Sequence, residues 1–283
     1  MTTAATSLAV PSAPAGRTRL TGKQTFGRAI RAEWLKLTTL RSTWVTSLLT
    51  LIITSGAGIA LALAYANTEE GDPTSWQMLP AGTTFGEIVV AVLGALVITG
   101  EYSSGQIRSS LAAVPRRTRL LTAKAAVIAA WSFLLGVVSI LLAWAIATPL
   151  MRTGTIALTD HRMLGYVWGT GLAYAGIALM SLGLGLLLRS TAGAITVVVC
   201  LLFVVQIPLG MAQLKWDWAS KAYEIIPSTS VNAVVDPFSV QVQWAEHAGS
   251  GMWLTHAAAA AVFAAWAIVP LLLAWVSFTR RDA

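Results

Sequence analysis

Five long stretches of this chain contain no charged residue, and this feature limits its fold more than any other. They cover residues 42–68, 125–151, 163–188, 190–214 and 247–279. Each is longer than the roughly 20 apolar residues that an α-helix needs to cross a bilayer. Of the 283 residues, 56% are hydrophobic and 11% are charged, whereas soluble domains carry about 25% charged residues. The composition excludes an ordinary soluble domain and a disordered chain, and it predicts an all-α membrane protein.

Six membrane spans are predicted within residues 44–279. Their approximate bounds are 44–66, 83–100, 124–150, 164–188, 192–214 and 255–278. The second span has the least support, because Glu87 and Glu101 leave only thirteen uncharged residues between them. We expect Glu87 to lie about one turn inside the outer edge, where its carboxylate can reach the interface. Pro208 and Pro270 fall inside the last two spans and are expected to kink them.

Basic residues are distributed unequally between the two ends of these spans. With the N-terminus inside, the inner segments hold fifteen Lys and Arg residues and the outer segments hold four. Cytoplasmic loops of membrane proteins carry such an excess. We therefore expect both termini to be cytoplasmic, with a disordered tail over residues 1–23 and a short tail over residues 280–283. This asymmetry accounts for the net charge of +7 without a nucleic-acid partner.

Residues 24–43 are predicted to form a basic amphipathic helix that lies on the inner membrane surface and contacts lipid. Apolar residues recur there at helical spacing, namely Phe26, Ile30, Trp34, Leu37 and Leu40. The basic residues of the segment lie largely off this stripe. Such a helix could be a topological anchor alone, or it could also contact a cytoplasmic partner.

The inner loop over residues 101–123 is longer than a connection between two spans requires. Ser103 and Gln106 form a capping-box pattern, which predicts the start of a short helix. Three apolar residues then share one face of that helix, namely Ile107, Leu111 and Val114. Pro115 ends it, and Arg116 with Arg117 follows as a basic corner. The helix could dock into a groove of a cytoplasmic partner or form a hairpin on anionic lipid.

The outer loop over residues 215–254 is too hydrophobic for a solvated loop, because it carries several Trp, Tyr and Phe side chains. We expect short helices that dip into the outer leaflet and are interrupted at Pro227 and Pro237. In the fourth span, Gly165 and Gly169 are four residues apart and would let another helix approach closely.

Motifs for chemistry are missing from the sequence. It contains no G-x-x-x-x-G-K-[ST], no G-x-S-x-G and no H-E-x-x-H pattern. The three His residues share no motif, and the single Cys200 is interpreted as a packing residue. The predicted spans lack the paired ionisable residues of an ion-coupled path. We therefore expect a chain that is not an enzyme and that depends on another subunit for energy.

Two inner segments resemble a known family. The run Arg31–Leu37 followed by Leu40–Trp44 resembles the amphipathic helix before the first span of bacterial, particularly actinobacterial, ABC-2-type transporter permeases. The stretch from Ile98 to Arg117, followed by Lys124, resembles their first cytoplasmic loop.

The resemblance implies an ABC-2-type exporter permease in the bacterial plasma membrane, with six spans and an N-terminal connecting helix. It implies association with a separate ATP-binding subunit, which would hold ATP and Mg, and with a second permease copy or a homologue. This chain itself would need no cofactor. The exported substrate would be lipophilic, peptide or drug-like, and its binding residues stay unassigned. The residues implied in contact with the ATPase are Glu33, Glu101, Ser103, Gly105, Gln106, Ile107, Arg108, Leu111, Val114, Pro115, Arg116 and Arg117.

Two other functions stay open from the residues alone. A secondary carrier or channel would work without an ATPase, and it predicts intramembrane ionisable groups or inverted repeats. An intramembrane enzyme would need a nucleophile–base pair or metal ligands at bilayer depth, which the scattered His residues do not provide.

Overall fold

The computed structural model describes residues 25–68, 70–113, 116–247 and 251–280. These residues form helices and loops, with no β-strand among them. Six helical segments are long and apolar enough to cross a membrane, which confirms the six predicted spans. They are Arg41–Ala66, Ser75–Ser103, Arg117–Leu150, His161–Leu188, Thr191–Ala212 and His256–Phe278.

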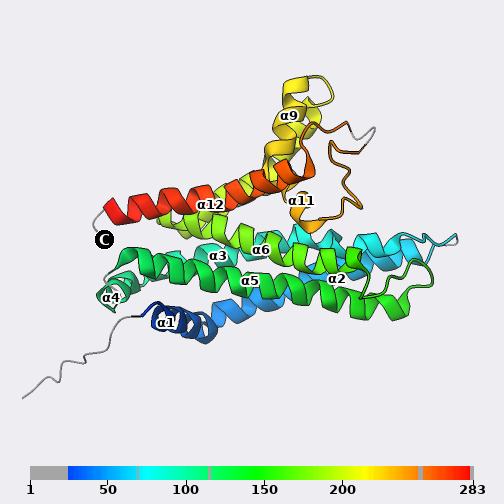
Figure 1. Ribbon diagram of the computed structural model, residues 1–283. Coiled ribbons are helices and arrows are strands. Elements are labelled where there is room, and N and C mark those ends of the chain that lie inside the picture. Colours follow the sequence, from blue (N-terminus) through cyan, green and yellow to red (C-terminus); the bar gives the residue numbers. More distant parts are fainter. Residues whose placement is uncertain (1–24, 69, 114–115, 248–250, 281–283) are drawn as a thin grey trace, which may run out of the picture.

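The long helices run side by side, and the short helices lie toward the two ends of the bundle (Figure 1). One end carries α1, α4 and the C-terminal end of α12, and we call it the α1 end. Helices α9 and α11 lie away from this end, and α9 projects from one side of the bundle (Figure 1). In chain order the elements are α1 (Phe26–Thr39), α2 (Arg41–Ala66), η1 (Ser75–Gly82), α3 (Thr83–Ser103), α4 (Gln106–Ala113), α5 (Arg117–Ala147), η2 (Thr148–Leu150), α6 (His161–Leu188), α7 (Thr191–Val199), η3 (Cys200–Val204), α8 (Gln206–Ala212), α9 (Asp217–Ile225), α10 (Pro227–Ser230), α11 (Asn232–Val235) and α12 (His256–Arg280).

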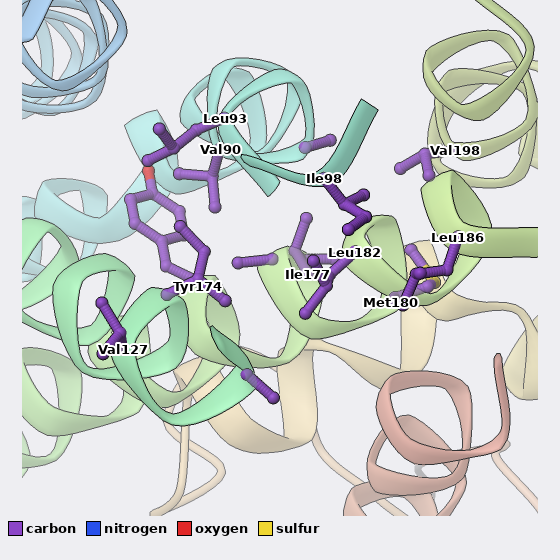
Figure 2. Packing of buried hydrophobic residues seen from close by; sticks show 14 of the residues in the cluster. Val90, Leu93, Ile98, Val127, Tyr174, Ile177, Met180, Leu182, Leu186 and Val198 are labelled. Atoms are coloured by element: carbon purple, nitrogen blue, oxygen red, sulfur yellow. The ribbon is translucent and has the colours of Figure 1, made fainter. Parts of the chain in front are cut away.

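Helix α6 forms the centre of the bundle and packs against α3, α5 and α12. Figure 2 shows Tyr174, Ile177 and Leu182 of α6 among apolar side chains of α3, α5 and α7. Small residues permit the close approach. A Cβ atom on Gly136 of α5 would lie 2.6 Å from the carbonyl oxygen of Thr170. Because lipid is as apolar as the protein core, such close packing is what associates helices in a membrane.

Helix α2 is arranged in the opposite way to a helix of a soluble protein. Its buried residues are small or hydroxylated, namely Thr43, Thr46, Ser47, Thr50, Thr54, Ser55, Gly58, Ala62 and Ala66. Large apolar side chains such as Leu48 and Ile52 are exposed. Two of its hydroxyl groups bond to neighbouring helices: Ser47 Oγ accepts from Trp131 Nε1 at 2.9 Å, and Thr54 Oγ1 lies 2.5 Å from the hydroxyl oxygen of Tyr174. Exposed apolar side chains of this kind need lipid around the helix.

Of two predictions about residues of the spans, the one about Glu87 is wrong. Glu87 is 3% exposed, so it is enclosed by the bundle and does not reach the interface. The reason is that the 3₁₀ helix η1 runs directly into α3, so the apolar helical segment begins at Ser75 and Glu87 lies further inside it than predicted. The predicted close approach of another helix is confirmed at Gly169, where the neighbouring backbone belongs to α11, whereas Gly165 lies against the side chains of Pro237 and Phe238.

The fifth span is irregular in its middle. Its segment Cys200–Val204 is π-helical, and Val205 N donates to Cys200 O at 2.9 Å. Pro208 has no N–H for the carbonyl of Val204, and its ring crowds that group, so the disturbance lies one turn before the proline. Pro270 lies within the continuous helix α12, where a kink stays a prediction.

Short helices in the predicted outer loop are confirmed. Helix α10 begins at Pro227, and α11 ends at Val235 before Pro237. The loop after α11 is organised by carboxylates. Asp236 accepts hydrogen bonds from the backbone N–H groups of Val240, Gln241 and Val242, and Glu224 accepts from Leu254 at 2.8 Å. Whether these helices enter the outer leaflet stays a prediction.

Candidate functional site

Helix α1 lies across the α1 end of the bundle (Figure 1) and packs against α5. The hydroxyl of Thr25 accepts a hydrogen bond from the backbone of Arg28 and caps the start of the helix. The buried face consists of Ala29, Glu33 and Leu37. Three members of the predicted apolar stripe stay exposed, namely Phe26, Trp34 and Leu40. The helix therefore packs a face with a carboxylate against the bundle and leaves apolar side chains outside.

A sharp turn joins α3 to α4. Gly105 has φ of 69°, a conformation that few residues other than glycine adopt readily. The predicted capping box is not formed, because α3 extends as far as Ser103. The hydroxyl of Ser103 donates to the carbonyl oxygen of Gly100 at 3.1 Å within α3. Helix α4 then begins at Gln106, with Ser103 and Gln106 in different helices.

Four charged side chains meet where α1, α3 and α5 come together, and we call them the ionic cluster: Glu33, Lys36, Glu101 and Lys124. Lys36 Nζ lies 2.7 Å from Glu33 Oε1 and 3.0 Å from Glu101 Oε1. Lys124 Nζ lies 2.5 Å from Glu33 Oε2 and 2.8 Å from Glu101 Oε1. Each lysine thus bridges both carboxylates, and the formal charges balance.

The ionic cluster also reaches α4. Lys36 Nζ donates to Ser110 Oγ at 2.9 Å. Ser110 and Ile107 lie three residues apart on the buried face of α4, and each is 6% exposed. Ile107 belongs to the main apolar core together with Leu121 and Phe278. Among the described side chains of α4, Ile107 therefore attaches the helix through apolar contacts and Ser110 through a polar one.

Burial makes the balance of charges in the ionic cluster important. Glu33, Glu101 and Lys124 are each at most 5% exposed. Burial by itself would raise the pKa of Glu33, but Lys124 and Lys36 lower it below its ordinary value. Burial would likewise lower the pKa of Lys36, but Glu33 and Glu101 raise it. Both groups are therefore charged at neutral pH and form true ion pairs.

The predicted basic corner is divided between two environments. Arg116 is exposed and precedes the first residue of α5. Arg117 instead donates from Nη1 to the carbonyl oxygen of Phe278 at 2.7 Å, and its guanidinium lies 5.7 Å from the centre of the Phe278 ring. The Arg117 side chain thus binds the C-terminal end of α12, and its contact with a partner stays a prediction.

The other residues of the predicted contact set divide into four groups. Glu33 and Glu101 are enclosed in the ionic cluster, so this chain covers them. Gly105 and Gln106 are exposed in the turn and at the start of α4. Arg108 and Leu111 also lie in α4, whereas Val114 and Pro115 lie outside the described residues.

Three residues of the site were missed by sequence reasoning, namely Lys36, Ser110 and Lys124. A signal was present for the two lysines. Glu33 and Glu101 are the only acidic residues of the predicted inner segments before Asp282. Two isolated acids in a strongly basic region could have indicated internal ion pairs with nearby lysines. No pattern pointed to Ser110.

A family model described as ABC-2 family transporter protein matches residues 29–207. The chain belongs to the ABC-2 transporter family. The match runs from α1 to the start of α8, so it includes the ionic cluster and α4. No curated protein sequence matches the chain.

As a member of the ABC-2 family, the chain is a membrane subunit of an ABC transporter and is not itself catalytic. The family implies association with an ATP-binding subunit and often with a second permease. Residues 208–283, which include α9 to α12, lie outside the matched region.

Proposed function

We propose that this ABC-2 permease is the membrane-spanning subunit of an ATP-driven exporter in the bacterial plasma membrane. In this proposal the α1 end and both termini face the cytoplasm, and a separate ATP-binding subunit docks on α4 and on the exposed part of α1. The excess of basic residues at this end supports the orientation.

One observation carries the proposal, namely that the ionic cluster and Ser110 join α1, α3, α4 and α5 at one point. Among the side chains of α4 that the structure describes, Gln106 and Ser109 are exposed, whereas Ile107 and Ser110 are buried. A force on α4 would therefore pass through Ser110 and Lys36 into α1, and through the two carboxylates into α3 and α5.

The mechanism that we propose begins with ATP binding, which closes the partner subunits. They pull on α4 and α1, and the spans formed by α2, α3 and α7–α8 change from inward-open to outward-open. A second permease copy or a homologue would complete the pathway. The spans at Arg41–Ala66 and Thr191–Ala212 support this, because only 33% and 17% of their most apolar stretches are buried within this chain.

The experiment compares Ser110→Ala with Ser109→Ala in the complex with its ATP-binding subunit. Ser110→Ala removes the hydrogen bond from Lys36, at a cost on the order of 1 kcal/mol, which is too small to unfold the protein. Ser109 bonds only within α4, to the carbonyl oxygen of Gln106. We expect Ser110→Ala to lower permease-dependent ATP hydrolysis several-fold, while Ser109→Ala stays near the wild type.

Equal ATP hydrolysis in the two variants would remove the Ser110 link from the mechanism. Purification of the permease from native membranes without any ATP-binding subunit, under conditions that preserve complexes, would contradict the proposed function. A secondary carrier or channel would then be the better interpretation.

A further inference from the structure

A groove of about 360 Å³ lies between α2 and α5. It faces outward, because Trp44, Leu48 and Leu134 in its walls are each at least 50% exposed. Its lining is apolar, since Ser47 Oγ, the hydroxyl group in it, already accepts the hydrogen bond from Trp131 Nε1. The remaining lining residues are Leu51, Leu135 and Val138. A hydrocarbon chain fits this lining better than a polar ligand does.

Three tryptophan side chains lie at the end of the groove that is nearer to the α1 end. The ring of Trp131 on α5 makes edge contacts with Trp34 of α1 and Trp44 of α2, at 5.4 and 5.5 Å between ring centres. Trp44 Nε1 donates to the carbonyl oxygen of Thr38 at 2.8 Å, which links the end of α1 to the start of α2. Tryptophan is enriched where the hydrocarbon of a bilayer meets its head groups. We therefore place this end of the groove at the head-group depth of one leaflet.

The length of the groove suits one acyl chain. From Trp44 to Leu51 the helix α2 rises about 10 Å, at about 1.5 Å per residue. The segment from Trp131 to Val138 on α5 has the same number of residues. One leaflet contributes about 15 Å of hydrocarbon. A chain that starts at the three tryptophans and follows the groove therefore stays within one leaflet.

Positive charge lies beside the same end of the groove. Arg41 is the first residue of α2, one turn before Trp44, and Arg31 of α1 is one turn before Trp34. Both arginine side chains are exposed, and neither forms a hydrogen bond or an ion pair with another described residue. They are therefore available to a phosphate group, unlike the lysines of the ionic cluster. No side chain caps the start of α2, so the positive end of its helix dipole adds to this field.

A second copy of this chain is the other candidate for the groove. In a symmetric pair of subunits the same surface patch faces itself. Two copies joined at this groove would therefore bring the arginines of one copy toward those of the other. Like charges placed together in this way disfavour a second copy, whereas an anionic ligand complements them.

We propose that the groove binds one acyl chain of an anionic phospholipid, such as phosphatidylglycerol, from the leaflet at the α1 end. The phosphate group lies beside Arg41 and Arg31, and the chain packs on Trp44, Leu48 and Leu134. The bound lipid holds α1 and α2 against α5, because it extends the contact among the three tryptophans. The site does not depend on an ATP-binding subunit.

The test uses the delipidated full-length protein in detergent, and native mass spectrometry counts the bound lipid and the protein copies. The probes are phosphatidylglycerol and phosphatidylcholine with the same acyl chains. We expect the wild type to prefer phosphatidylglycerol and Arg41→Gln to reduce this preference about fivefold, as one basic residue near an anionic head group implies. Arg116→Gln removes an exposed arginine outside the groove and should keep the preference. Equal binding of the two lipids by the wild type would indicate annular lipid only and would overturn the proposal.

A pair of tryptophan variants on α5 locates the site. Leu134→Trp fills the groove, and we expect it to abolish the preference for phosphatidylglycerol. Ile146→Trp is the matched control, since Ile146 is 46% exposed on the same helix and lies outside the groove. Retention of the preference in Leu134→Trp would contradict the location. Loss of a second protein copy in Leu134→Trp, with bound lipid unchanged, would assign the groove to a protein interface and overturn the proposal. If Leu134→Trp does not fold, Arg41→Gln still decides, because Arg41 lies at the first residue of its span.

Discussion

At the scale of single residues, the ionic cluster shows why two acidic side chains are tolerated in the bundle. An isolated buried charge costs several kcal/mol, and pairing offsets this cost only when geometry and hydrogen bonding are good. Lys36 and Lys124 each contact both Glu33 and Glu101 at 2.5 to 3.0 Å. We interpret the ionic cluster as a device that fixes the relative positions of α1, α3 and α5, since buried ion pairs add little net stability.

The pKa shifts of the ionic cluster predict how stability depends on pH. The lowered pKa of Glu33 means that its ion pairs stabilise the fold fully above about pH 4.5, and that this stability is lost as the pH falls through the lowered value. The raised pKa of Lys36 means that its contribution is complete below about pH 10.5 and is lost as the pH rises through the raised value. We expect a plateau of the melting temperature between these limits.

Tryptophan-fluorescence melts of Glu33→Gln and Glu70→Gln test the acid side of this plateau. Glu70 is exposed and serves as the control. Glu33→Gln should show a smaller fall toward acid pH, and not its complete loss, because Asp160, Asp72 and Glu246 also have lowered pKa values. An acid-side fall in Glu33→Gln as large as that in Glu70→Gln would contradict the role of Glu33.

At the scale of elements, glycine positions decide how closely the helices pack. The crossing of α5 and α6 places Gly136 against the backbone of Thr170 and Gly171. At the crossing of α6 and α12, a Cβ atom on Gly183 would lie 2.6 Å from the amide nitrogen of Leu271. Backbone cannot move aside as a flexible side chain can, so these crossings do not accommodate an added methyl group.

Alanine substitution of two glycines should therefore have effects of opposite sign. Gly136→Ala forces the α5–α6 crossing apart, and we expect it to lower stability by about 1–3 kcal/mol. Gly56→Ala adds a methyl group in open space, and the better helix propensity of alanine should leave stability equal or raise it by up to about 1 kcal/mol. Unfolding in mixed micelles measures both. A Gly136→Ala variant as stable as the wild type would show that this crossing is not close.

At the scale of the whole molecule, burial decreases from the centre of the bundle to its periphery. In α6, 72% of the most apolar stretch of the helix is buried. The corresponding shares are 22% in α12 and 17% in the span Thr191–Ala212. Helix α6 with its neighbours α3 and α5 forms the core of the bundle, while the peripheral spans leave apolar faces exposed, which we propose contact lipid and a second permease. The elements that we expect to bind the ATPase all lie at one end of this core.

Single cysteines can determine which end of the molecule faces the cytoplasm. In a Cys200→Ser background, which removes the one native cysteine, Ser109→Cys reports on α4 and Lys221→Cys reports on α9. Both positions are exposed. In sealed right-side-out vesicles, a membrane-impermeant maleimide should label Lys221→Cys at once and Ser109→Cys only after permeabilisation. Labelling of Ser109→Cys from outside would place α4 in the wrong compartment for an ATPase.

The amino-acid sequence by itself determined the number of spans, the amphipathic helix before them and the helix between the second and third spans. Lipid requires about 20 apolar residues for each span, whatever the neighbouring helices are, so this signal is local. Local sequence also indicated the helix α4. Its start was wrongly assigned to a capping box at Ser103, because α3 extends further than its apolar residues indicate.

Only the tertiary structure decided which charged residues meet. Lys36 contacts Glu101 across 65 positions, Lys124 contacts Glu33 across 91, and Arg117 binds the carbonyl of Phe278 across 161. The tertiary structure alone also decided the burial of Glu87 and the packing of α11 on Gly169. These contacts depend on the rotation and depth of each helix in the bundle. In a membrane the lipid-facing and protein-facing sides are both apolar, so the hydrophobic pattern of one helix does not reveal which side faces its neighbours.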